Sequence, residues 1–192
     1  MPESNGLPIE LDNLSIRRVE YRDASDLLEI YSNPNAAKYE FEGLWTADDI
    51  EDLLHSQADI YAGAPGVPLM LAVELQETNK VIGCCQITIN SVQDRQGEIG
   101  FTFNPLYCGR GLATRAVDAS LGYGFTSLQL HRIMAAVDVL NERSWQLMER
   151  IGMRREAHFV HDNLVDGEWV DDYVYAMLDN EWRAKNGTIT MR

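Results

Sequence analysis

The sequence contains no apolar run that approaches the roughly 20 residues required for a membrane-spanning helix. Basic residues are also scarce: 16 Lys and Arg stand against 30 Asp and Glu, and the formal net charge of −14 argues against nonspecific binding to nucleic acids. The first residues, Met-Pro-Glu-Ser-Asn, lack the basic and apolar pattern of a signal peptide. We therefore expect a cytoplasmic protein that binds neither membranes nor nucleic acids.

Cysteine is rare as well. Three cysteines are present (Cys84, Cys85 and Cys108), an odd number whose spacing does not match a metal site. Reduced thiols in a cytoplasmic protein are the simplest interpretation. The histidines lack the carboxylates or cysteines that would complete a ligand set, so we expect no metal.

Internal repeats, linkers and low-complexity tracts are absent too. The 192 residues, with 45% hydrophobic content, suffice for one substantial core. We therefore expect a single domain over residues 1–192, with its core at about 14–182 and flexible ends at about 1–12 and 184–192.

The spacing of apolar residues predicts an α/β (α+β) fold whose mixed central sheet has about seven strands, flanked by about four helices. The apolar run 132–140 predicts a strand that is buried on both faces and parallel to its neighbour across the preceding helix. The turn pair Asp166-Gly167 predicts a hairpin. The expected strands are 14–20, 69–75, 81–89, 97–103, 132–140, 153–164 and 168–178. The expected helices are one with Asp23 as its N-cap, one that begins at Thr46 with the capping box Thr46-Ala-Asp-Asp49, one from Leu112, and one capped by Asn141.

Residues 98–115 form the most informative stretch of the sequence. Residues 98–103 alternate as a strand does, Pro105 ends that strand, and an apolar helical stripe begins at Leu112. Between strand and helix lies Cys108-Gly-Arg-Gly-Leu-Ala113, whose glycines allow a sharp turn in front of unpaired helix N–H groups. This arrangement suits a phosphate, although plain tight turns share it. It is neither a Walker loop nor a dinucleotide fingerprint, because Thr114 stands where the third glycine would be.

Charge is unevenly distributed along the chain. Between Arg95 and Arg155, eight arginines stand against five acids, a local balance of +3, and the remainder therefore carries −17. The contrast fits one part that holds an anionic cofactor and another that faces a cation. Solvated surface charge would give the same pattern.

The order of elements and four motifs resemble the GNAT superfamily of acyl-CoA-dependent N-acetyltransferases, and within it the RimJ/RimL-like branch of ribosomal-protein and polyamine acetyltransferases. The resemblance extends from Ile16 to Trp182. The motifs are Cys108-X-X-Gly111-X-Ala113, the stretch 123–133, the stretch 141–153 with Asn141-Glu-Arg-Ser144, and Asp166-Gly-Glu-Trp-Val-Asp171 with Tyr175. The implied structure is the GNAT fold.

The resemblance implies acetyl-CoA as co-substrate. The strand backbone would pair with its pantetheine arm, and the glycine loop would hold its pyrophosphate, with Arg110 and Arg115 adding positive charge. Asn141 corresponds to an asparagine that touches the cofactor, although helix capping alone would also explain it. The implied cofactor residues are Phe101, Thr102, Phe103, Cys108, Gly109, Arg110, Gly111, Leu112, Ala113, Thr114 and Asn141.

Two residues depart from the family pattern. Cys108 replaces the usual Gln or Arg, which removes a polar side chain but leaves the backbone of the loop intact. Met148 stands where many GNAT enzymes have a tyrosine that protonates the departing thiolate. Ser144, one turn earlier, occupies the position of the serine often proposed for that role in this branch.

Glu98 is the leading candidate for the general base, because it directly precedes the expected thioester position and its face-mates Gly100 and Thr102 are small enough to admit substrate. A strand carboxylate paired with an arginine is the structural alternative. The acceptor pocket is expected to include Glu42, Trp45 and Asp171, among clusters of acids that favour a cationic acceptor. Alternatively, Trp45 is a hydrophobic staple and Glu42 is solvated.

We expect direct transfer of an acetyl group to a primary amine, on a protein N-terminus or a polyamine-like molecule. An acyl-CoA-binding regulatory protein that has lost catalysis is one alternative, supported by Met148. A small-molecule acetyltransferase of aminoglycoside type is another. By resemblance, the protein is a monomer or a homodimer.

Overall fold

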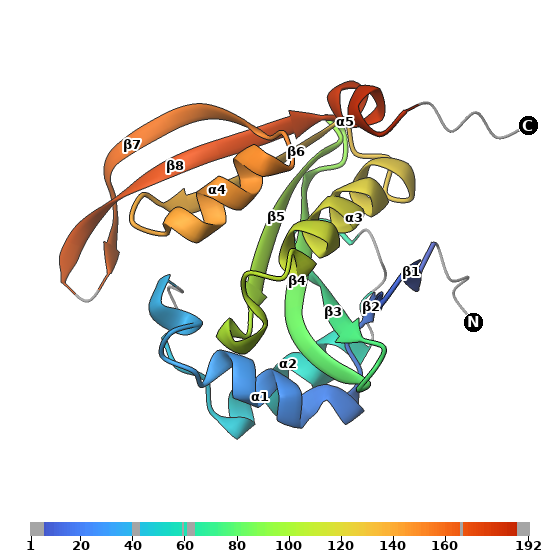
Figure 1. The fold of residues 1–192 in the computed structure, drawn as a ribbon. Helices are drawn as coiled ribbons and strands as arrows, with labels where there is room; N and C mark the ends of the chain where they lie inside the picture. The colour runs from blue at the N-terminus through green and yellow to red at the C-terminus, as the bar shows by residue number, and fades with distance from the viewer. Residues whose placement is uncertain (1–5, 40–42, 59, 61–63, 166, 188–192) are drawn as a thin grey trace, which may run out of the picture.

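The computed structural model describes residues 6–39, 43–58, 60, 64–165 and 167–187. Within these ranges all strands join one sheet in the order β1-β2-β3-β4-β5-β6-β8-β7 (Figure 1). The strands are β1 (Ile9–Leu11), β2 (Leu14–Arg18), β3 (Leu69–Leu75), β4 (Lys80–Ser91), β5 (Gln96–Phe103), β6 (Arg132–Asp138), β7 (Arg154–Val165) and β8 (Glu168–Leu178). The α-helices are α1 (Ala24–Tyr31), α2 (Ala47–Ala58), α3 (Leu112–Thr126), α4 (Glu142–Arg150) and α5 (Asp179–Asn186), and short 3₁₀ turns are η1 (Tyr21–Asp23), η2 (Ala37–Tyr39) and η3 (Pro105–Tyr107).

The predicted mixed α+β fold is confirmed, with two additional elements in the described residues. Strand β1 lies in the segment expected to be a loose tail, and it pairs with β2 from Ile9↔Ile16 to Leu11↔Leu14. Helix α5 follows β8 directly and extends beyond the expected core. Trp182 of this helix contacts Phe125 of α3, with 6.1 Å between ring centroids.

The two faces of the sheet bury different helices. Alternation along each strand sends Leu71 and Cys85 toward the core beneath α3 and α4, and Ala72 and Cys84 toward the core beneath α1 and α2. The predicted parallel pairing of β5 with β6 is confirmed. Burial of β6 on both faces was predicted wrongly, because this strand alternates and Ala136 is exposed.

A buried ion cluster joins β2 and β3 to the turn that precedes α1. Arg17 of β2 donates to Asp23 at 2.8 Å and to Glu74 of β3 at 2.5 Å, and all three side chains are about nine-tenths buried or more. Asp23 also accepts the backbone N–H of Glu20 at 2.8 Å. Asp23 precedes α1 as predicted, but its side chain makes no cap bond to that helix because Arg17 and Glu20 engage it.

Local capping signals at the second helix behave as predicted. Thr46 and Asp49 form the reciprocal capping box, with the N–H of Thr46 donating to Asp49 at 2.7 Å and the N–H of Asp49 donating to Thr46 at 3.3 Å. No helix in the described ranges has both the length and the apolar character needed to cross a bilayer.

Candidate active site

The two central parallel strands separate at Glu98. Strand β5 pairs with β4 along its whole length, as far as Phe103↔Gly83. Its pairing with β6 covers only Gln96↔Arg132 to Glu98↔Met134, although β6 continues to Asp138 alongside β8. The sheet therefore opens between β5 and β6 just beyond Glu98. Figure 1 shows the β6–β8–β7 part of the sheet, with α4 beside it, diverging from the β1–β5 part.

A cavity of about 550 Å³ lies at this opening. Its wall combines β5, the end of β6, the start of α4 and the α1–α2 region. Residues of β3, β4 and β8 also line it, so the structure brings together segments that are far apart in the chain. The sequence-predicted residues that line the cavity are Trp45, Glu98, Phe101, Thr102, Asn141 and Ser144.

Glu98 is half-buried in this wall. Asn90 donates to its Oε2 at a long 3.4 Å, and within the described residues no ion pair joins Glu98 to an arginine. The carboxylate therefore faces the cavity rather than a structural partner. Its face-mates Gly100 and Thr102 also line the cavity, and a Cβ at position 100 would lie 2.8 Å from the amide nitrogen of Gln86.

The glycine loop has the backbone that its sequence requires. Gly109 and Gly111 have φ of +76° and +74°, and Gly111 is the N-cap of α3 without any side-chain cap bond. A Cβ on either glycine would meet nothing within 4 Å. The first N–H groups of α3 thus stand behind an open, uncovered turn, and the helix dipole makes this end positive.

Residues 108–111 are exposed, and neither they nor Leu112, Ala113 and Thr114 belong to the cavity wall. Phe103 is also outside that wall and packs against Phe101, with 6.4 Å between ring centroids. The predicted cofactor residues therefore form two groups, one inside the cavity and one at the start of α3.

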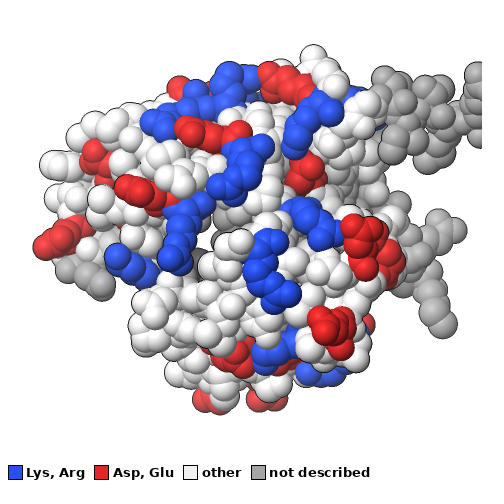
Figure 2. Space-filling view, in the orientation of Figure 1, with Lys and Arg blue, Asp and Glu red and all other residues white. Residues whose placement is uncertain are grey.

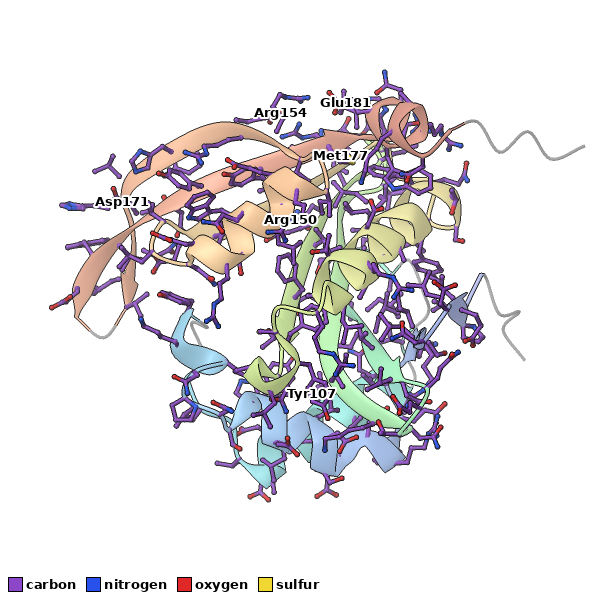
Figure 3. The ribbon with its side chains drawn as sticks, in the orientation of Figure 1. Tyr107, Arg150, Arg154, Asp171, Met177 and Glu181 are labelled. Carbon is purple, nitrogen blue, oxygen red and sulfur yellow. The ribbon has the colours of Figure 1, made fainter. Side chains whose placement is uncertain are left out.

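Arginines gather near the start of α3. Arg150 of α4 donates to the hydroxyl of Thr114 at 3.1 Å, and Figure 3 shows it directed toward α3. Figure 2 shows a row of Lys and Arg side chains across α4 and the beginning of α3. Arg115 instead donates to Asn13 at 2.8 Å. Sequence reasoning missed Arg150, since only the packing of α4 beside α3 brings it there.

The start of α4 forms one wall of the cavity. The side chain of Asn141 accepts the N–H of Ser144 at 3.3 Å, so Asn141 both caps this helix and lines the cavity. Met148 lies one turn after Ser144 and is 2% exposed. Trp145 donates to the carbonyl of Val139 at 3.1 Å and fixes the loop that precedes the helix.

The acceptor side is formed by segments that are distant in sequence. Trp45 stacks on Tyr31 at 4.6 Å between ring centroids, so it is both a packing residue and part of the cavity wall. The hydroxyl of Tyr39 donates to the carbonyl of Leu140 at 3.0 Å, which links the α1–α2 segment to the β6–α4 loop. Glu42 lies outside the described residues.

The structure does not bring Asp171 to the cavity. Asp171 lies toward the hairpin end of β8 (Figure 3), where it is 2.9 Å from Nε2 of His158 and accepts the N–H of His161 at 2.9 Å. The N–H of His161, followed by the ring of His158, lowers the pKa of Asp171. The next residue, Asp172, lines the cavity instead. Neighbouring strand residues point to opposite faces, which explains the difference.

Comparison with known proteins agrees with this geometry. The family model described as "Acetyltransferase (GNAT) domain" matches residues 13–154. The uncharacterized N-acetyltransferase YnaD of Bacillus subtilis is 34% identical over 174 residues, which cover 91% of this chain and 98% of that protein. Spermidine N(1)-acetyltransferase of Escherichia coli is 26% identical over 183 residues, or 92% of this chain and 91% of that protein.

A solved structure has the same fold. The acetyltransferase (GNAT family) from Bacillus anthracis matches with a TM-score of 0.79 and 34% identity, covering 90% of this chain and 99% of that chain. These similarities agree with two features of the structure: the separation of β5 and β6, and the glycine turn before α3, which has no side-chain cap. The chain therefore belongs to the GNAT family and is an N-acetyltransferase.

Proposed function

We propose that this N-acetyltransferase moves the acetyl group of acetyl-CoA directly to a primary amine of a cationic acceptor, either a polyamine-like molecule or a protein N-terminus. The observation that carries the proposal is the position of Glu98. Its carboxylate faces the cavity at the last residue where β5 pairs with β6. A base is thus held where the sheet opens.

The residues present fit acetyl-CoA, which supplies the acetyl thioester. The edge of β5 beyond Glu98 is not covered by β6, so this stretch can receive a narrow amide-containing arm. The open turn at Gly109 and Gly111, together with Arg150, suits a pyrophosphate. Asn141 and Ser144, at the start of α4, line the same cavity as Glu98.

The residues then have separate roles in transfer. Glu98 accepts a proton from the incoming ammonium, which frees the nitrogen lone pair to attack the thioester carbonyl. The C–N bond forms as the C–S bond breaks, and the departing sulfur takes up a proton. Ser144 orients that proton through its hydroxyl or a held water. A serine hydroxyl is a weak acid, so its contribution is smaller than that of Glu98.

The name of the relative from Escherichia coli, a spermidine N(1)-acetyltransferase, supports a polyamine-like acceptor. The carboxylates of Glu98, Asp138 and Asp172 all line the cavity, and they favour a cationic acceptor. Release of CoA thiol, measured alongside mass analysis of polyamines, aminoglycosides and N-terminal peptides, tests the proposal. Acetyl-CoA binding without thiol release for any amine would instead favour a regulatory acyl-CoA-binding protein, the alternative that the buried Met148 supports.

Gly111→Ala is expected to weaken acetyl-CoA binding at least about tenfold, or roughly 1.4 kcal/mol. A methyl group at φ of +74° strains the backbone of the turn, which is expected to move the N–H groups at the start of α3 that would hold the pyrophosphate. Calorimetric titration with acetyl-CoA measures the change. Gly167→Ala is the matched control, because Gly167 has φ of +84°, has equally open surroundings and lies in the β7–β8 turn. Equal affinities of the two variants would contradict the assignment.

Cys108→Ala is expected to retain most activity. Cys108 is exposed and lies outside the cavity wall, so it is not placed to carry the acetyl group. The measurement is kcat for the best acceptor, combined with a search by mass spectrometry for an acetyl adduct on the thiol. An adduct that goes on to acetylate the acceptor would require a two-step mechanism instead.

A further inference from the structure

Asp172 holds a buried carboxylate oxygen without a partner. The residue is 3% exposed and lines the cavity. Asn163 donates to its Oδ2 at 2.5 Å, whereas its Oδ1 has no hydrogen-bond partner in the described part of the protein. A buried hydrogen-bond acceptor without a donor costs free energy, and a charged acceptor costs more. A ligand that donates to Oδ1 would remove this cost.

A second carboxylate lies directly opposite. Asp138 of β6 is the cross-strand partner of Asp172, so both side chains stand on the same face of the sheet, and both line the cavity. Asp138 accepts the N–H of Leu140 at 2.7 Å. Like charges that face each other across two strands are destabilising unless a cation lies between them. Burial, and then the nearby Asp162, Asp138 and Asp171, raise the pKa of Asp172.

These carboxylates are separated from Glu98 along the sheet. Glu98 is paired with Met134, and Asp138 lies four residues further along β6, or about 13 Å at roughly 3.3 Å per residue. Alternate residues of a strand point to the same face of the sheet. Met134, the partner of Glu98, is four residues from Asp138, so Glu98, Asp138 and Asp172 share one face. One extended molecule can therefore reach both places without leaving the cavity.

We propose that Asp172, assisted by Asp138, binds a second ammonium group of the acceptor while the reacting amine lies at Glu98. The acceptor class is a linear diamine or polyamine rather than a monoamine. Asp172 thereby acts as a specificity-determining residue. This inference rests on the proposed amine acetylation, because it assigns the far end of the same substrate.

The test compares α,ω-diamines of increasing length with n-alkylamines of the same carbon number, in the presence of acetyl-CoA. The wild-type protein is expected to prefer diamines long enough to span the two places. Asp172→Asn is expected to lower kcat/KM for those diamines about 10- to 100-fold, mainly through KM, because a charge-assisted bond is lost. The same change is expected to leave kcat/KM for the monoamines near the wild-type value.

Two comparison variants sharpen the result. Glu168→Gln removes a carboxylate charge at an exposed position at the start of β8 that is not part of the cavity wall, and it is the matched control. Asp171→Asn changes the neighbouring residue on the opposite face of β8, so a loss of diamine preference there, with none in Asp172→Asn, would overturn the proposal. Equal losses for diamines and monoamines in Asp172→Asn would overturn it too. Near-wild-type thermal stability of Asp172→Asn shows that the variant is folded, since Asn replaces a buried charge with a neutral group of similar shape.

Calorimetry without acetyl-CoA separates this inference from the proposed function. The wild-type protein is expected to bind a long diamine at least about tenfold more tightly than Asp172→Asn does. Equal binding would refute the ammonium site even if amines are acetylated. Tight binding of Mg²⁺ that depends on Asp172 and excludes the diamine would show that the carboxylates serve a metal instead. If no amine is acetylated at all, the proposed function fails while the binding result still stands.

Discussion

Glu98→Gln is expected to lower kcat by about 10²–10⁴, the usual loss on removal of a general base. Glutamine keeps the shape and hydrogen-bonding capacity of the side chain but cannot accept the proton of the incoming ammonium. Glu98 has no ion pair within the described residues, so the change should leave the fold intact. Initial rates at saturating acetyl-CoA and acceptor give the effect directly.

The pH profile distinguishes proton transfer from other roles of Glu98. An alkylamine has a pKa near about 10.4 and an α-amino group near about 7.7–8.0, so the neutral fraction of either amine grows as pH rises. The variant should therefore recover part of its rate at high pH. Ser144→Ala is the companion variant, expected to lose less rate and to bind acetyl-CoA nearly as well. A Glu98→Gln protein with wild-type kcat from pH 6 to 9 would make this carboxylate structural.

Arg17→Leu is expected to lower the free energy of unfolding by about 3–5 kcal/mol. The guanidinium is held between Asp23 and Glu74, whose side chains are only 4% and 10% exposed. Leucine would leave Asp23 buried without its cation and Glu74 with only Arg22, which lies 3.3 Å away and is 56% exposed. For a protein of this size the midpoint of thermal unfolding should fall by roughly 10 °C.

A matched control is available on the surface. Arg154 makes ion pairs with Glu156 and Glu181 but is 47% exposed, so Arg154→Leu is expected to cost about 1 kcal/mol or less. Adding Glu74→Gln to Arg17→Leu should restore part of the lost stability, because it removes a buried charge that Arg22 only partly compensates. An Arg17→Leu protein as stable as the Arg154→Leu protein would show that the cluster contributes little.

Features set by local sequence could be predicted. The sharp turn at Gly109 and Gly111, the cap at Asn141 and the capping box at Thr46 each depend on residues within one turn. The parallel pairing of β5 with β6 also followed, since a helix connects the two strands.

Features set by distant contacts could not be predicted. Asp23 was expected to cap α1, but Arg17 engages its side chain. Tyr39 bonds to Leu140, 101 residues away, and nothing in either segment signals that contact. The acceptor wall also depends on which face of the sheet each residue of β8 occupies. The register of β6 with β8 places Asp172 in the cavity wall, whereas Asp171 lies outside it. The motif around Asp171 identifies this part of the chain, but it does not determine the strand register that decides which residue faces the cavity.

The most direct test of the account is mass analysis of diamines and polyamines after incubation with acetyl-CoA and the wild-type protein, with CoA thiol measured in the same reaction. We predict one acetyl group on a primary amine for each thiol released, with no acetyl group carried on the protein. Acetyl-CoA that binds but gives neither free thiol nor acetylated amine would contradict direct transfer at Glu98.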